Sequence, residues 1–128
     1  MGALYGESSA SRLSTWSRDN VYTQFGDLLI NTINTNGVWT SGGLSSGRGD
    51  VRTQGQWLIG AKSDRAPGIG DVFLLDPSNG GWPPEVDIAE GSAGQPRMMS
   101  VLHYDANNKQ VITYLTVDIS QWHTHGES

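Results

Sequence analysis

The chain has 128 residues, a net charge of −5 from 13 acidic and 8 basic residues, and no cysteine. This length corresponds to about one domain. The acidic balance and the lack of a Lys/Arg cluster argue against a nucleic-acid partner, because phosphate binding requires clustered basic side chains. Without cysteine there is no disulfide framework and no thiolate chemistry. The longest apolar runs, residues 28–30 and 72–75, are far too short to span a membrane, so no membrane partner is expected.

The first 15 residues are rich in Ser, Gly and Ala and are expected to be weakly structured. Beyond them, short runs of β-branched, aromatic and aliphatic residues alternate with Gly, Asn, Asp and Pro, which predicts an all-β fold. Strands are expected over residues 20–25, 27–33, 38–46, 52–62, 70–76, 85–90, 98–105 and 110–118. Short antiparallel strands of this kind favour a β-sandwich or jelly roll, here as one domain over residues 1–128.

Hairpin turns are predicted where Asn or Gly tolerates a positive φ, at residues 25–27, 35–37 and 107–109. Along residues 110–118, alternate positions from Val111 to Val117 share one face, whereas Tyr114 and Thr116 take the other. This alternation predicts a half-buried antiparallel strand.

The segment GGWPPEVDIAEGS, residues 80–92, places the acids Glu85, Asp87 and Glu90 within six residues. In a regular strand the first two acids share a face and Glu90 points away from them. One extra residue, inserted as a β-bulge, would return Glu90 to the same face. The spacing therefore predicts a bulged strand with three carboxylates on one side.

Such a row of acids has three interpretations. A retaining glycosidase needs two carboxyl groups about 5–5.5 Å apart, and same-face residues of a strand lie about 6.5–7 Å apart at the backbone, so their side chains can converge. A solvated charge run is the commonest explanation of clustered acids, and a calcium site is another. The Pro-Pro pair and the apolar residues between the acids favour a functional site over a solvated run.

The acidic segment resembles the catalytic signature of glycoside hydrolase family 16, in the bulged Glu-x-Asp-x-x-Glu form of its laminarinase-like members. Residues 39–46 (WTSGGLSS), 54–77 and 122–128 (WHTHGES) are similar to other segments of the family, so the resemblance covers most of residues 16–128. It implies a concanavalin A-like jelly roll. Because family domains continue past the Trp-His segment, it also implies that the C-terminal part of the domain is lacking here.

The resemblance implies that Glu85 is the nucleophile, Asp87 the assisting carboxylate and Glu90 the acid/base. His103 is similar to a family histidine that reaches the same cleft; the alternative is a histidine satisfied at a strand edge. Trp82 and Trp39 are candidates for stacking on sugar rings, with core packing as the alternative.

His123 and His125 stand at alternate positions and could bind a metal together with His103. No cysteine or ligand spacing supports such a site.

The function implied is that of a secreted, endo-acting retaining β-glycosidase that cleaves a β-linked polysaccharide such as β-1,3-glucan and requires no cofactor. A structural calcium occurs in many relatives but cannot be placed in this sequence. Residues 70–74 lack the tryptophans with which many family members build subsites, which supports the alternative of a non-catalytic carbohydrate-binding or half-domain protein. A structural β protein that uses the acids for calcium is a third hypothesis. Open sheet edges would favour self-association.

Overall fold

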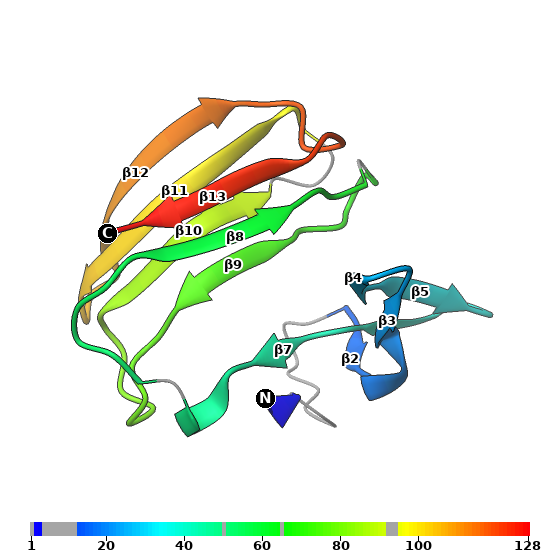
Figure 1. The fold of residues 1–128 in the computed structure, drawn as a ribbon, viewed down its shortest axis with the longest axis horizontal. Helices are drawn as coiled ribbons and strands as arrows, with labels where there is room; N and C mark the ends of the chain where they lie inside the picture. The colour runs from blue at the N-terminus through cyan, green and yellow to red at the C-terminus, as the bar shows by residue number, and fades with distance from the viewer. Residues whose placement is uncertain (1, 4–12, 50, 65, 92–94) are drawn as a thin grey trace. The chain divides into compact units, whose positions relative to one another are not determined.

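The computed structural model describes residues 2–3, 13–49, 51–64, 66–91 and 95–128. These residues form β-strands and short 3-10 turns without an α-helix, so the all-β prediction is confirmed (Figure 1). No helix in the described ranges is long and apolar enough to cross a membrane. The chain divides into two compact units, Met1–Val51 and Arg52–Ser128. Of the residues 1–15 expected to be weakly structured, positions 1 and 4–12 lie outside the described residues.

The described residues of the N-terminal unit form three small sheets. Its strands are β1 (Gly2–Ala3), β2 (Thr15–Trp16), β3 (Val21–Gln24), β4 (Asp27–Ile30), β5 (Thr32–Thr35), β6 (Val38–Ser41) and β7 (Leu44–Ser45), and its 3-10 turns are η1 (Arg18–Asn20) and η2 (Gly47–Gly49). β3 and β4 form a hairpin, and β1 pairs with β7. The third sheet has the order β2-β6-β5, with β2 parallel to β6 and β5 antiparallel to it.

Two strands predicted in this unit were too long. Residues 27–33 break at Asn31, whose N–H donates to the carbonyl of Asn20 at 2.8 Å instead of to a neighbouring strand. Residues 38–46 break at Gly42, whose N–H donates to the carbonyl of Asn31 at 2.8 Å. A Cβ at Gly42 would lie 2.7 Å from the Asn20 carbonyl oxygen, so this close approach requires glycine.

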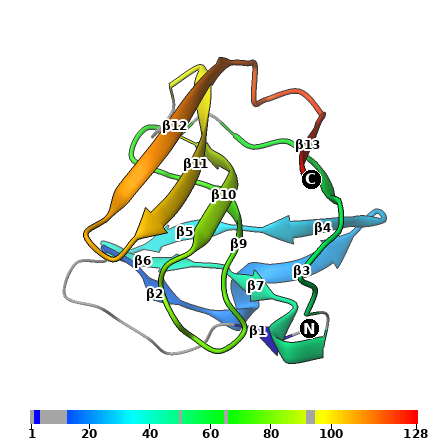
Figure 2. The same ribbon diagram turned by 90° about the vertical axis from the view of Figure 1, so that its left-hand side faces the viewer.

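The C-terminal unit has a four-stranded antiparallel sheet and a separate two-stranded pair. Its strands are β8 (Trp57–Ala61), β9 (Val72–Leu75), β10 (Glu85–Gly91), β11 (Arg97–Asp105), β12 (Lys109–Thr116) and β13 (His123–Glu127). The sheet has the order β12-β11-β10-β9, and β13 pairs with β8 (Figures 1 and 2). The structure thus starts a strand at Trp57 rather than at residue 52. It adds β13, which the sequence did not predict because its His, Gly and Glu residues have little strand propensity of their own.

The core of the C-terminal unit is small and lies on one face of the four-stranded sheet. Ala89, Met98 and Ile119 are buried there, and the partly buried side chains of Phe73 and Val117 pack against them. β13 contacts β10 on this face.

β12 pairs antiparallel with β11, as predicted, but the expected half-burial was wrong. Val111 is 59% exposed and Leu115 is 55% exposed. The physical reason is position: β12 is the edge strand of the sheet, and Leu115 borders a cavity of about 150 Å³ that also involves residues of β10, β11 and β13.

The three predicted hairpin turns are confirmed. Phe25, Asn36 and Asn108 adopt φ values of 54°, 54° and 57°, in the left-handed region. Each turn joins paired antiparallel strands, β3 to β4, β5 to β6 and β11 to β12.

Candidate functional site

A β-bulge interrupts β10 between its first two acids and its third. Against β11, Asp87 pairs with residue 101 and Glu90 with residue 99, so three steps on β10 match two on β11. Against β9, Asp87 pairs with residue 74 and Ala89 with residue 73, which identifies Ile88 as the extra residue. The bulge predicted from the acid spacing is therefore confirmed.

The bulge brings all three acids to one face of the sheet. Glu85, Asp87 and Glu90 lie opposite residues 103, 101 and 99 of β11, respectively. Alternate residues of a strand share a face, and so do directly opposed residues of an antiparallel pair. The same side of the sheet therefore carries four residues that we term the acidic site: Glu85, Asp87, Glu90 and His103.

The segments at both ends of β10 have distinct local backbone features. The strand is preceded by two consecutive cis peptide bonds, Trp82-Pro83 and Pro83-Pro84. At its other end, the N–H of Gly91 donates to the Asp71 carbonyl at 2.7 Å. A Cβ at Gly91 would overlap the Asp71 carboxylate, so a larger residue here would require the Asp71 side chain to move aside.

His103 contacts both acids at the start of β10. Its Nε2 lies 3.2 Å from Oδ2 of Asp87 and 3.8 Å from Oε1 of Glu85. Its Nδ1 lies 2.8 Å from Oδ1 of Asn108. His103 is on β11, an internal strand between β10 and β12, and its side chain is 15% exposed. Both ring nitrogens thus have polar partners at the acidic site.

Asp87 is the most buried of the acids, at 4% exposure. Its cross-strand neighbours are the aliphatic Leu74 on β9 and Val101 on β11. Burial raises the pKa of Asp87, and the charge and hydrogen bond of His103 partly oppose this rise. A carboxyl group in this environment retains its proton to higher pH than in water.

Glu90 has a raised pKa for more than one reason. Burial raises its pKa most, the carboxylates of Asp87 and Glu85 add to the rise, and His103 opposes it. A glutamic acid that stays protonated beside other carboxylates is suited to donate a proton.

Exposed aromatic side chains lie beside the acidic site. The ring of Trp82 lies 5.7 Å from that of His103, at an interplanar angle of 51°, and the residue is 44% exposed. Tyr114 on β12 pairs with Met99, which pairs in turn with Glu90, so Tyr114 shares the face of the acids. It is 56% exposed, and the Arg97 guanidinium lies 5.2 Å from its ring centre.

Sequence reasoning missed Tyr114 and Asn108 as members of this region. Alternation placed Tyr114 on the correct face of its strand but could not relate it to the acids, because the register between strands is not local information. Asn108 was identified only as a turn residue. The feature of the sequence that could have revealed its role is its position in a hairpin turn, five residues after the candidate site residue His103.

The remaining candidates lie elsewhere. Trp39 is on β6 of the N-terminal unit, where it is 41% exposed, whereas the acidic site belongs to the C-terminal unit. His123 and His125 are on β13 with ring centres 6.1 Å apart, and His125 stacks on Phe73 at 5.9 Å. Burial, the largest cause, and the neighbouring His123 lower the pKa of His125.

A metal ion could be held within the acidic site. Among the described residues, ligand atoms of Glu85, Asp87 and His103 all lie within 4.8 Å of one another, and this group contains neither His123 nor His125. One imidazole nitrogen with two carboxylates suits a zinc-type ion better than calcium, which prefers oxygen ligands.

The chain matches no family model and no curated protein.

Proposed function

We propose that the acidic site hydrolyses a β-linked polysaccharide by the retaining mechanism, as its resemblance to glycoside hydrolase family 16 implies. The observation that carries the proposal is the bulge at Ile88, which places Glu85, Asp87 and Glu90 on one face. A solvated run of acids needs no such bulge. A retaining glycosidase does need convergent carboxyl groups with different protonation states.

In this mechanism Glu90 supplies the proton. Its raised pKa favours the protonated carboxyl group, which can donate to the departing glycosidic oxygen. Glu85 attacks the anomeric carbon and forms a glycosyl-enzyme bond. Water then hydrolyses this bond while Glu90, now ionised, takes up the proton of the water.

Asp87 lies between the two catalytic glutamates in the strand and is held by His103. The raised pKa of Asp87 favours its protonated form, which adds less negative charge beside Glu85 when Glu85 attacks. Trp82 beside His103, and Tyr114 on the same face two strands from Glu90, provide exposed aromatic surface on which the C–H faces of pyranose rings can pack. A β-1,3-glucan is the first substrate to test. The concanavalin A-like jelly roll and secretion are parts of the same proposal.

The experiment is a measurement of new reducing ends released from β-1,3-glucan, mixed-linkage glucan and galactan. Glu85→Gln and Glu90→Gln remove the nucleophile and the acid/base, whereas Glu127→Gln makes the same change at an exposed residue of β13, outside the acidic site, and serves as a matched control. The proposal is supported if the parent and the control are active and both glutamate variants lose about 10³-fold or more of that activity. Silence of the parent on every substrate refutes it.

Binding without hydrolysis is the second candidate. It is favoured by the β9 side of the site, where the neighbours of the acids are the aliphatic Val72 and Leu74 rather than tryptophans. If this function is correct, the parent and Glu85→Gln bind an insoluble β-glucan equally and neither releases reducing ends, whereas Trp82→Ala loses binding.

A further inference from the structure

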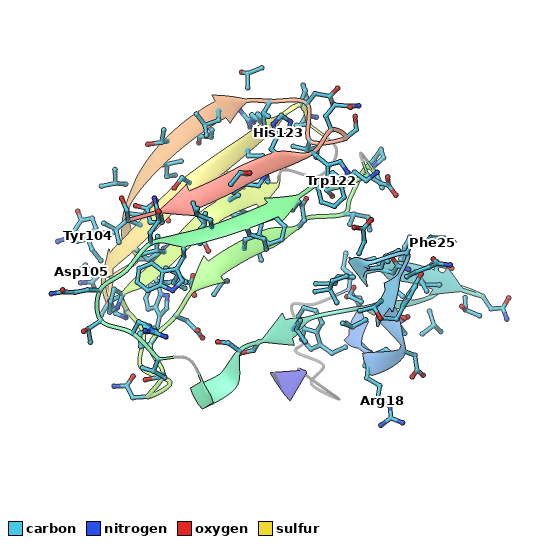
Figure 3. All side chains as sticks on the ribbon, viewed as in Figure 1. Arg18, Phe25, Tyr104, Asp105, Trp122 and His123 are labelled. Carbon is cyan, nitrogen blue, oxygen red and sulfur yellow. The ribbon has the colours of Figure 1, made fainter. Side chains whose placement is uncertain are left out.

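The turn between β11 and β12 holds Asn108 in a fixed position beside the acidic site. Oδ1 of Asp105 accepts hydrogen bonds from the N–H of Asn107 at 2.8 Å and from its Nδ2 at 2.9 Å. The N–H of Asn108 donates to the carbonyl of Asp105 at 2.9 Å. Asn108 itself has a φ of 57°, a conformation that Asn tolerates better than most residues. Figure 3 labels Asp105 at the end of β11, where this turn begins.

This turn aims the side chain of Asn108 at His103. Oδ1 of Asn108 lies 2.8 Å from Nδ1 of the imidazole. An amide oxygen can only accept a hydrogen bond, so Nδ1 carries the hydrogen in this arrangement. A neutral His103 then has a bare lone pair on Nε2, which lies 3.2 Å from Oδ2 of Asp87.

We propose that Asn108 is a positioning residue of the acidic site, which fixes His103 as the Nδ1–H tautomer and so directs Nε2 toward Asp87. The consequence for catalysis rests on the proposed function, because Asp87 lies between Glu85 and Glu90 on β10. The tautomer itself does not depend on that function.

The charged groups that face His103 are known for each strand packed against it. From β10 they are Asp87 and Glu85, in direct contact, and Glu90, which interacts through charge. From β12 the residue opposite His103 is the uncharged Gln110. Asn108 therefore decides which ring nitrogen faces these carboxylates.

The test compares Asn108→Gly, Asn108→Asp and a control, Asn36→Gly. Glycine accepts the φ of 57° but has no side chain, and aspartate keeps an acceptor that cannot donate. Asn36 has a φ of 54° in the hairpin turn between β5 and β6, so its change to glycine reports the general effect of this substitution. The readout is the ¹⁵N chemical shifts of both His103 ring nitrogens against pH, with His103→Gln to assign the signals.

We expect Nδ1–H in the parent, in Asn108→Asp and in Asn36→Gly. In Asn108→Gly we expect the neutral ring to shift to Nε2–H, which donates to Asp87. An Nε2–H tautomer in the parent, or the same tautomer in Asn108→Gly as in the parent, overturns the proposal.

Activity separates this proposal from the proposed function. If the parent is a glycosidase, the pH profile of kcat moves in Asn108→Gly and stays with the parent in Asn36→Gly. If the parent releases no reducing ends but the nitrogen shifts behave as expected, the proposed function fails and the positioning role stands. Unchanged nitrogen shifts in an active Asn108→Gly enzyme overturn the positioning role alone.

Discussion

Deletion of Ile88 should leave the acidic site in place, because Ile88 is the extra residue of the bulge. On the β11 side the pairs flanking the bulge are Asp87 with residue 101 and Glu90 with residue 99. On the β9 side Ala89 already pairs with residue 73. Without Ile88, Ala89 directly follows Asp87 and stands opposite residues 73 and 100. Both ladders then become continuous, and all three acids still share a face.

The expected cost of this deletion is modest. Ile88 is half-buried and borders the cavity on the core face, so its removal forfeits part of the 1.5–3 kcal/mol that full burial of an aliphatic side chain contributes. We expect a loss of about 1–2 kcal/mol in the free energy of unfolding and a fall in Tm on the order of 5 °C.

Deletion of Val86 is the matched control, because it removes one β-branched residue from the same strand outside the bulge. It would move Glu85 into the place of Val86, opposite Leu102 and Leu75 and on the face away from His103. A carboxylate moved to the core face costs several kcal/mol, so this variant should lose more than about 4 kcal/mol or fail to fold.

The assay is chemical denaturation combined with ¹³C NMR titration of the carboxyl groups. The Ile88 deletion should keep the raised pKa values of Asp87 and Glu90, since the same neighbours surround them. Equal destabilisation by the two deletions, or the loss of the raised pKa of Glu90 in the Ile88 deletion, would refute the register derived for β10.

Two further predictions concern stability. Met98 is 2% exposed in a small core, so Met98→Ala should lower the free energy of unfolding by about 2–5 kcal/mol. Leu115 is 55% exposed, so Leu115→Ala should lower it much less. Equal losses for the two variants in thermal denaturation would contradict this description of the core. The pKa values of Asp87 and Glu90 are raised above their ordinary values of 3.8 and 4.5, so the folded state binds these protons more tightly than the unfolded state. Their contribution to stability is complete below those ordinary values and is lost as the pH rises through the raised values. Asp87→Asn should therefore have a larger free energy of unfolding than the parent at neutral pH. Denaturation over a pH series would disprove this if the difference in free energy of unfolding between the two proteins did not grow with pH.

The sequence was sufficient for features that depend on neighbouring residues. The hairpin turns followed from Asn and Gly at positions that require a positive φ, as at Asn36 and Asn108. The bulge in β10 followed from the spacing of the acids, because Glu90 can join Glu85 and Asp87 on one face only with an extra residue.

Features that depend on pairing between distant segments could not be predicted. β13 is a strand because it pairs with β8, more than 60 residues earlier in the chain. The break at Gly42 follows from hydrogen bonding through Asn31, and the exposure of β12 follows from its place at the sheet edge. The contact between Asn108 and His103 likewise needs the register of the β11–β12 hairpin, which the sequence does not specify.

The most direct test of the central claim is the anomeric configuration of the first product released from β-1,3-glucan, followed by ¹H NMR before mutarotation. A retaining mechanism yields a β-anomer from the parent, and Glu85→Gln should yield no product. An α-anomer would mean that Glu85 is not a nucleophile. The absence of any product from the parent would contradict the assignment of the acidic site to glycoside hydrolysis.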